Sequence, residues 1–223
     1  MTHGPEPRQL PASAINFSRA AMALAVAFLA ILFSLHLIKP EFDPSWRLIS
    51  EYEVGRFGWL MTLAFLCWGG SALTLQQAIR TSMRTTSGRI GRWWLGLIGV
   101  AMIVAGVFRT TASDNPNITT SAVLHLAFAA IVVLTFPLAA SLVAGTLTRH
   151  PNWVAVRRRL VWATILVWCS LLAFFAWSMV AGMIHPTAGG FSPQLRLGWP
   201  NRFLAVAYSV WLIVVARYAA RSG

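Results

Sequence analysis

Four long runs of apolar residues divide the chain, and none of them contains a Lys, Arg, Asp or Glu. They cover residues 20–38, 57–79, 122–147 and 160–184. A helix that spans a bilayer needs about 17 to 25 mainly apolar residues, because each residue adds only about 1.5 Å of rise. Backbone groups in lipid must also be hydrogen-bonded within their own segment. The four runs therefore predict four transmembrane helices.

Two shorter apolar runs each lie between a pair of arginines. Arg92 and Arg109 flank the first run, and Arg202 and Arg217 flank the second. Both can span if the long arginine side chains reach toward the headgroups or are held inside the bundle. The expected fold class is an all-α polytopic membrane protein, with a tail over 1–16 and one six-helix domain over 17–220. The expected spans are about 17–38, 57–79, 93–108, 122–147, 160–184 and 202–219.

Small residues gather in the second and third predicted helices, where they offer faces for close helix packing. These residues are Gly69, Gly70, Gly96, Gly99, Ala101 and Ala105. The two cysteines, Cys67 and Cys169, lie near the middle of apolar runs, and they fit neither a disulfide framework nor a metal site. We expect both thiols to be buried like small hydrophobic side chains.

Composition and charge support a membrane protein and indicate its orientation. Only 11% of the residues are charged and 57% are hydrophobic, whereas soluble domains carry about 25% charged residues. The net charge of +12 comes from short loops, so no water-exposed basic domain is left to bind nucleic acid. Twelve basic residues fall on the side of the termini and six on the other. Because basic loops stay in the cytoplasm, we expect both termini to be cytoplasmic.

The longest loop on the predicted outer side covers residues 39–56. Trp46, Ile49 and Tyr52 recur there at helical spacing, which predicts a short interfacial helix before the second span. Glu51 lies within a turn or two of that span. An unpaired carboxylate at this depth would lose several kcal/mol of solvation, so it must face water or pair with a cation.

Two arginines are candidate partners for this carboxylate. Arg109 ends the third predicted helix, and Arg202 begins the sixth. Both helices are short, so both guanidiniums are drawn toward the hydrocarbon edge, where an arginine either snorkels to the headgroups or turns inward. We hypothesise that Glu51 pairs with Arg202, Arg109 or both, and the alternative is that each arginine snorkels.

The predicted outer side holds nearly all the groups that could carry chemistry. Five of the six acids fall there, together with His36, His125 and His185 at helix ends, and the sequence leaves open whether these histidines converge. The candidate catalytic acid–base residues are Glu51, Asp114 and His125. The candidate ligand-binding residues are Ser50, Glu51, Tyr52, Arg109, His125 and Arg202.

Several common kinds of site are missing from the sequence. No phosphate-binding glycine loop, nucleophile elbow or His-Glu-x-x-His helix occurs. Nothing fixes the pair of facing axial histidines that a b-type haem needs, so we expect neither a cofactor nor a metal. The middle of the spans is almost free of ionisable groups, which disfavours an ion-coupled transporter.

Short motifs at several helix ends resemble those of a known family. They are Ile49-Ser50-Glu51-Tyr52, Gly58-Trp59-Leu60-Met61, the stretch 108–114, Leu124-His125 and Asn201-Arg202-Phe203. In order and membrane placement they resemble the bacterial membrane family catalogued as domain of unknown function 998, from about the first helix to the C-terminus. The resemblance implies a six-helix bundle in the bacterial cytoplasmic (inner) membrane, and it implies no particular reaction.

Two functions stay open. In the first, which we favour because it demands least, a polar pocket at the outer-leaflet end of the bundle binds a lipid or small amphiphile. In the second, outer-face carboxylate and histidine groups carry out acid–base chemistry on a lipid or isoprenoid. A transporter is the least favoured. The expected partners are membrane lipids and such a ligand, and nothing in the sequence indicates the oligomeric state.

Overall fold

The computed structural model describes residues 12–189 and 191–221, and over these residues the chain is all-helical. The six long helices are α1 Ala12–Ile38, α2 Gly58–Ala78, α3 Thr86–Val107, α4 Thr120–Leu147, α5 Arg157–Ile184 and α6 Gly198–Ala219. Short 3-10 helices lie in the connections: η1 Ile49–Glu53, η2 Arg80–Ser82, η3 Pro151–Val156 and η4 Pro193–Leu195. The predicted all-α fold with six long helices is therefore confirmed.

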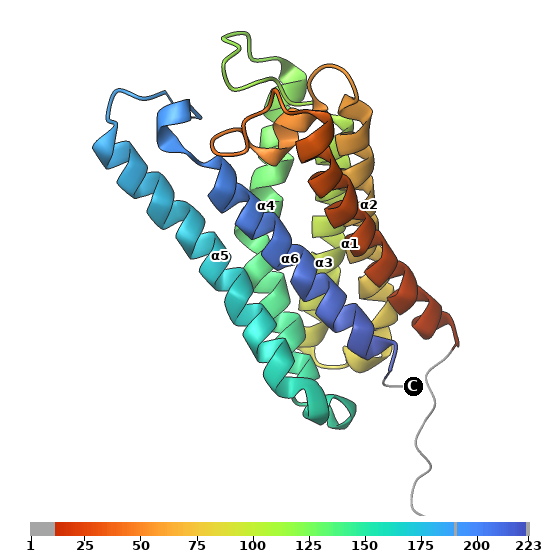
Figure 1. Ribbon diagram of the computed structural model, residues 1–223. Coiled ribbons are helices and arrows are strands. Elements are labelled where there is room, and N and C mark those ends of the chain that lie inside the picture. Colours follow the sequence, from red (N-terminus) through yellow and green to blue (C-terminus); the bar gives the residue numbers. More distant parts are fainter. Residues whose placement is uncertain (1–11, 190, 222–223) are drawn as a thin grey trace, which may run out of the picture.

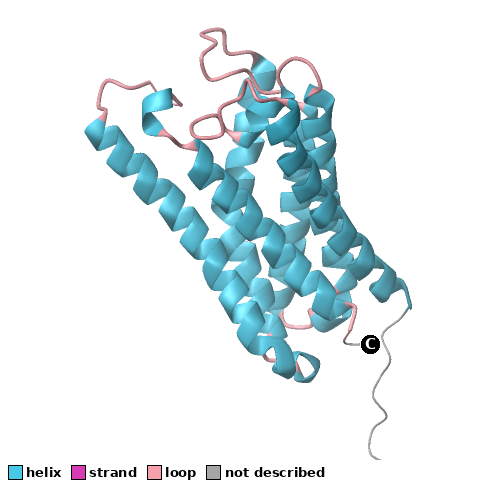
Figure 2. Ribbon diagram, in the orientation of Figure 1, coloured by secondary structure: helices cyan, strands magenta, loops and turns pink. Residues whose placement is uncertain are grey.

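The six helices run alternately in opposite directions and form one bundle (Figures 1 and 2). Each helix packs against the next along the chain, and α6 returns to pack against α1. The loops after α1, α3 and α5 therefore meet at one end. We call it the acidic end, because five of the six acids of the chain lie in these loops. The opposite end, with the loops after α2 and α4, is the basic end.

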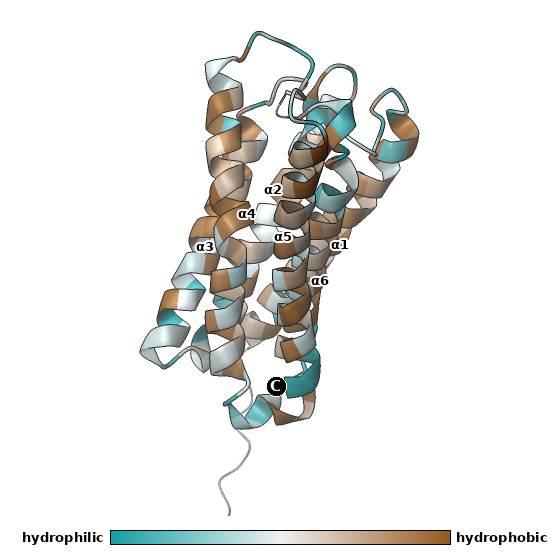
Figure 3. Ribbon diagram, turned by 90° about the vertical axis from the view of Figure 1, so that its left-hand side faces the viewer, coloured by the Kyte–Doolittle hydropathy of each residue, from teal (hydrophilic) through white to brown (hydrophobic). Residues whose placement is uncertain are grey.

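All six long helices have the length and hydropathy of membrane spans. Hydrophobic residues dominate the helices, and many hydrophilic residues lie toward the two ends of the bundle (Figure 3). Large apolar side chains such as Leu97, Leu172 and Met183 are more than 60% exposed on the outside of the bundle. Such an extensive apolar exterior is stable where lipid surrounds it. The chain is a multi-pass membrane protein.

Small residues let α2 and α3 approach each other closely. A Cβ at Gly69 would lie 2.5 Å from the backbone oxygen of Gly99, and a Cβ at Gly99 would lie 2.8 Å from that of Gly69. Near the acidic end, a Cβ at Gly106 would lie 2.6 Å from the Cβ of Phe65. A side chain at any of these positions would push the helices apart. The close approach at Gly106 places the last turn of α3 against α2, and this turn contributes carbonyl groups to the site described below.

Several helices extend beyond their apolar runs. α3 begins at Thr86, before the run that starts at 93, and the Thr85 hydroxyl caps it by accepting from Gly88 N. Within this extension, Arg92 donates to the side chain of Gln76 on α2 at 3.1 Å. α1 begins at Ala12, inside the expected tail over 1–16, of which residues 1–11 lie outside the described residues.

The two cysteines lie in different surroundings. Both are free thiols; Cys67 is partly buried, whereas Cys169 is exposed on α5. Only 28% of the most apolar window of the η3–α5 segment is buried, so much of this helix faces the surroundings of the bundle. The expectation that both thiols are buried is therefore wrong for Cys169, because an apolar run fixes membrane depth and not which face of a helix packs inward.

Candidate functional site

The connection between α1 and α2 folds back into the acidic end, and residues 49–54 (the η1 segment) are its centre. Ile49, Glu51, Tyr52 and Glu53 of η1 are all buried. The segment packs tightly on the start of α2, since a Cβ at Gly58 would lie 2.0 Å from Glu53 O. The side chains of these four residues therefore point into the bundle. That η1 lies at a membrane interface stays a prediction.

Lys39 holds the η1 segment from the end of α1. Its ammonium group donates to Tyr52 O at 2.9 Å and to Val54 O, and it lies 4.4 Å from the centre of the Phe42 ring. The residue is 1% exposed. Burial lowers the pKa of this ammonium group, and the charge of Glu41 partly opposes the change. Two carbonyls and an aromatic face replace the water that the charge gives up.

Glu51 has hydrogen-bond donors on both carboxylate oxygens. Oε2 accepts from Arg47 at 2.7 Å and from Ser113 N at 3.0 Å. Oε1 accepts from Leu48 N at 3.0 Å and from the Ser113 hydroxyl at 2.9 Å. The residue is 2% exposed. Four donors thus replace water around a buried carboxylate, which makes Glu51 a fixed link between two loops.

The hypothesised ion pair of Glu51 with Arg202 or Arg109 is wrong. The carboxylate pairs with Arg47, because the loop brings this guanidinium to it from only four residues away. Arg47 also pairs with Asp114, with distances of 2.6 and 3.0 Å. These hydrogen bonds raise the pKa of Arg47 and lower that of Asp114. The chain of three charges joins the α1–α2 loop to the α3–α4 loop, where the Asp114 side chain is 60% exposed.

Arg202 is buried in α6 and holds the same loop from another side. Its Nε donates to His36 Nε2 at 2.8 Å, and Nη1 donates to Arg47 O at 2.7 Å and Gly198 O at 3.1 Å. Nη2 donates to the Tyr52 hydroxyl at 3.1 Å. The other ring nitrogen of His36 lies 2.8 Å from a backbone carbonyl of α1, so Nδ1 carries the proton and Nε2 accepts. At 5% exposure, the guanidinium does not snorkel.

Glu53 and His125 form a second buried pair. Glu53 Oε2 accepts from Thr110 N at 3.2 Å and lies 3.5 Å from His125 Nδ1. That nitrogen is closer to two carbonyl oxygens of α3 and its end, Ala105 O at 2.7 Å and Phe108 O at 3.0 Å. Nδ1 therefore carries the imidazole proton and donates its hydrogen bond to these carbonyls. The carboxyl group and the ring are close neighbours without a hydrogen bond of normal length between them.

The carboxyl group of Glu53 lacks the set of donors that Glu51 has. Burial raises the pKa of Glu53 to about 8, although the Thr110 N–H group and the charge of Arg109 oppose the change. At neutral pH this carboxyl group is therefore mostly protonated. Its second oxygen, Oε1, is buried and has no hydrogen-bond partner among the described residues. Buried polar atoms nearly always have a partner, so this oxygen marks a place where an interaction is incomplete.

The other residues proposed from the sequence lie around these networks. Arg109 is exposed and Ser50 is half-buried. His185 is exposed at the end of α5. The three histidines of the acidic end lie in three different surroundings, since His36 contacts α6, His125 contacts η1, and His185 lies at the surface.

Three charged residues of the site were not predicted from the sequence: Lys39, Arg47 and Glu53. A signal existed for Glu53, which is the acid nearest to the second apolar run. A signal also existed for Arg47, because opposite charges four residues apart often pair. Nothing in the pattern identified Lys39, whose partners are backbone carbonyls.

The site offers hydrogen bonding and proton exchange. The protonated carboxyl group of Glu53 can both donate and accept a hydrogen bond. The imidazole of His125 has Nε2 as its acceptor, because Nδ1 faces carbonyls. Over residues 12–189 and 191–221, no group of three or more His, Cys, Asp or Glu side chains has the arrangement of a metal site.

Comparison with known proteins identifies a family. The family described as "Protein of unknown function (DUF998)" matches residues 21–218. No curated protein and no solved structure matches the chain. The matched stretch contains the η1 segment and the buried charged residues that surround it, and it reaches from α1 into the last turns of α6. Because the match covers nearly the whole six-helix bundle, the chain belongs to this family of unknown function.

Proposed function

We propose that this membrane protein binds a lipid or a small amphiphile through Glu53 and His125 at the acidic end. The observation that carries the proposal is the unpartnered oxygen of Glu53. Lys39, Glu51 and Arg202 are buried at the same end and find their partners within the protein. Glu53 Oε1 has none among the described residues. A hydroxyl or carbonyl group of a ligand would complete its hydrogen bonding.

The surroundings of this pair suit an amphiphile. Val107 precedes Phe108, whose carbonyl contacts His125, and Val123 and Leu126 flank His125 on α4. These three apolar side chains are between 53% and 61% exposed on the outside of the bundle. An amphiphile along α3 and α4 would place its tail on them and its polar end toward the carboxyl group. Since that group is neutral at pH 7, the polar end need not carry a charge.

An acid–base enzyme acting on a lipid or isoprenoid is the second candidate, and the pKa of Glu53 favours it. A carboxyl group with a pKa of about 8 is still protonated at neutral pH. It could therefore act as a general acid and transfer its proton to a substrate. Glu51 and Asp114 suit this role less well, because both are bonded to the guanidinium of Arg47. Glu53 therefore replaces them as the candidate acid.

Mass spectrometry of amphiphiles that copurify with the protein in mild detergent tests the binding proposal. We expect a defined amphiphile with the wild type and with Glu53→Gln, because the amide of Gln still has N–H donors and a carbonyl acceptor. Glu53→Leu, of similar size but without polar atoms, should lose it. Glu41→Gln, which changes an exposed acid of the same loop, is the matched control. Equal retention by Glu53→Leu would overturn the proposal.

The same variants separate binding from catalysis. A binding protein would hold the same unchanged amphiphile in the wild type and in Glu53→Gln. An enzyme would convert it in the wild type, and Glu53→Gln would accumulate it unconverted because an amide is not a general acid. The Tm of each variant shows whether a lost ligand reflects a lost fold.

We further propose that the acidic end faces away from the cytoplasm of a bacterium whose inner membrane holds the protein. The excess of basic residues at the other end supports the orientation, and the family resemblance supports the location. Ser87 at the basic end and Asn115 at the acidic end are both exposed. In cells, Asn115→Cys should react with a membrane-impermeant thiol reagent, and Ser87→Cys should react only after the membrane is opened. The opposite pattern would reverse the orientation.

A further inference from the structure

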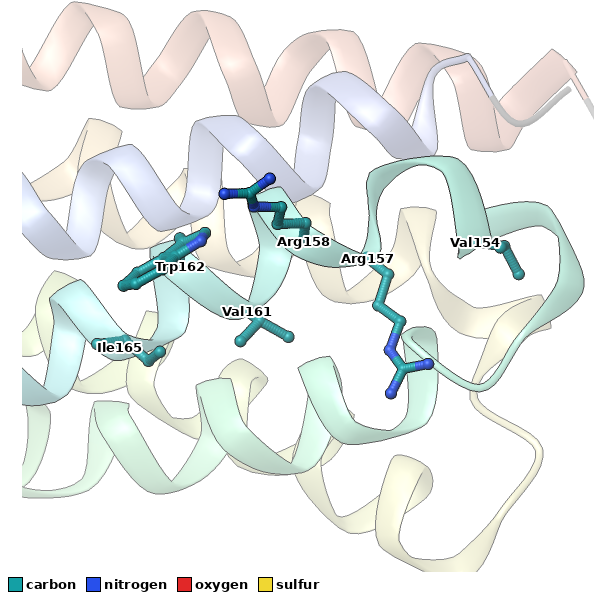
Figure 4. Close-up of a pocket in the computed structure, with 6 residues that line it drawn as sticks. All are labelled: Val154, Arg157, Arg158, Val161, Trp162 and Ile165. Carbon is teal, nitrogen blue, oxygen red and sulfur yellow. The ribbon is translucent and has the colours of Figure 1, made fainter.

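A shallow, open groove lies on the outside of α5 at the basic end, at the opposite end of the bundle from Glu53 and His125. Its volume is about 510 Å³ (Figure 4). Five of the lining residues belong to the first turns of α5, and their spacing of one, three and four positions places them on one face of the helix. The lining residues are Val154, Arg157, Arg158, Val161, Trp162 and Ile165.

The three consecutive arginines at the start of α5 fall into two kinds. Arg159 donates to the hydroxyl of Tyr218 on α6, so this arginine is part of the bundle. Arg157 and Arg158 are exposed. Neither guanidinium has an ion-pair or hydrogen-bond partner among the described residues, and in Figure 4 the two point to different sides of Val161. Two positive charges thus flank the end of an apolar strip.

The lining changes from charged to apolar along the helix. Arg157 and Arg158 occupy the first turn of α5, and Val161, Trp162 and Ile165 follow with exposed fractions between 40% and 59%. The distance along the axis from the second arginine to the last apolar residue is about 10 Å. Trp162 suits the boundary, because a tryptophan ring is apolar on its face and carries one polar N–H. A phospholipid has the same order of polarity, with a phosphate above an acyl chain.

We propose that this groove binds an anionic phospholipid of the surrounding membrane. The phosphate would contact the guanidinium of Arg157 or of Arg158, each of which can bond two phosphate oxygens, and the charge of the other arginine would add to the attraction. One acyl chain would lie along Val161, Trp162 and Ile165. A lipid fits better than a soluble anion, because the apolar part of the groove belongs to a helix with the hydropathy of a membrane span. The groove and the acidic-end site share no residue.

Native mass spectrometry of the protein released from nanodiscs with equal amounts of phosphatidylglycerol and phosphatidylcholine tests the proposal. We expect phosphatidylglycerol to be the preferred bound lipid. The double variant Arg157→Gln/Arg158→Gln should reduce the bound phosphatidylglycerol about tenfold, since each arginine near a charged lipid strengthens binding several-fold. The control Arg80→Gln/Arg217→Gln removes the same charge from two exposed arginines of the basic end outside the groove.

The controls give results that would overturn the proposal. An equal loss in both double variants would show a general attraction to basic surface, and no loss in the groove variant would show that these arginines do not hold the lipid. Inorganic phosphate at millimolar concentration should leave the bound lipid in place, because it cannot contact the apolar wall. Displacement by inorganic phosphate would assign the groove to a soluble anion. Ligand retention by Glu53→Leu is measured separately, so the two proposals can fail independently.

Discussion

Replacing Glu53 with Gln should change how the stability of the protein depends on pH. Burial raises the pKa of this carboxyl group from its ordinary value of 4.5 to about 8. In the unfolded chain the group is exposed, and its pKa returns to near the ordinary value. Between these two pH values, the folded protein therefore binds more protons than the unfolded chain.

A pKa that is higher in the folded state favours folding at low pH. The contribution is complete below about pH 4.5 and is lost as the pH rises through about 8. A change from 4.5 to about 8 corresponds to at most about 5 kcal/mol of unfolding free energy. The Glu53 side chain is 0% exposed, so water screens this effect little.

The comparison is an unfolding titration in micelles at about pH 5, 7 and 9. The Gln side chain stays neutral over this range, whereas the wild type loses stability as Glu53 ionises. The unfolding free energy of Glu53→Gln minus that of the wild type should therefore increase by several kcal/mol as the pH rises. Glu41→Gln should follow the wild type, because Glu41 is exposed. Arg109 and His125 are present in all three proteins, so neither accounts for such a difference between them.

Parallel pH profiles of Glu53→Gln and the wild type would refute this reasoning. They would show that the carboxyl group has nearly the same pKa in the folded and unfolded chains. Water or a cation would then have to reach Glu53 in the folded protein. The proposed general acid would be lost in that case, and the unpartnered oxygen would no longer indicate a missing ligand.

Three further predictions concern the network and the packing. Arg202→Gln should lower the unfolding free energy by about 1 to 3 kcal/mol, because buried neutral acceptors lose their donor. The exposed control Arg196→Gln should change it by less than about 0.5 kcal/mol. Near-equal values would contradict a structural role for Arg202. In thermal melts, Gly69→Ala should lower the free energy of unfolding by about 1 to 3 kcal/mol, because the added methyl group separates α2 from α3. In the control Gly145→Ala the new Cβ has open space around it, so the free energy of unfolding should stay the same or rise by up to about 1 kcal/mol. Cys169 lies exposed on an apolar helix, so it should react with an apolar maleimide in micelles but not with a charged maleimide in intact membranes. Reaction with the charged reagent would show that α5 borders water.

The number of helices follows from the sequence because a bilayer restricts both the length and the composition of a span. The ends of the helices follow less well. α3 starts at Thr86, before Arg92, and α6 starts at Gly198, before Arg202. An arginine can lie within a helix when neighbouring helices offer hydrogen-bond acceptors, as they do for both of these side chains. An apolar run therefore marks the middle of a helix, and contacts between helices decide where it ends.

The acidic end was predictable as a place but not as a set of partners. Glu51 and Glu53 lie two residues apart in a 3-10 helix, which has three residues per turn, so their side chains point about 120° away from each other. Glu51 meets Ser113 of the α3–α4 loop, whereas Glu53 lies beside His125 of α4. Which acid faces which element depends on how the η1 segment packs against the start of α2. Spacing along the chain does not encode that packing.

The two ends of the bundle use their charges in different ways. At the acidic end, Lys39, Arg47 and Arg202 donate to carbonyl and carboxylate groups of the loops, so these charges hold the η1 segment in place. At the basic end, Arg157 and Arg158 have no such partners among the described residues, and their field acts on whatever lies outside. Most of the net charge of +12 therefore acts at the basic end. The same asymmetry that would orient the chain in a membrane leaves arginines at the basic end to meet anionic headgroups. At the acidic end, Lys39, Glu51 and Arg202 bond within the protein, and Glu53 keeps one oxygen without a partner among the described residues.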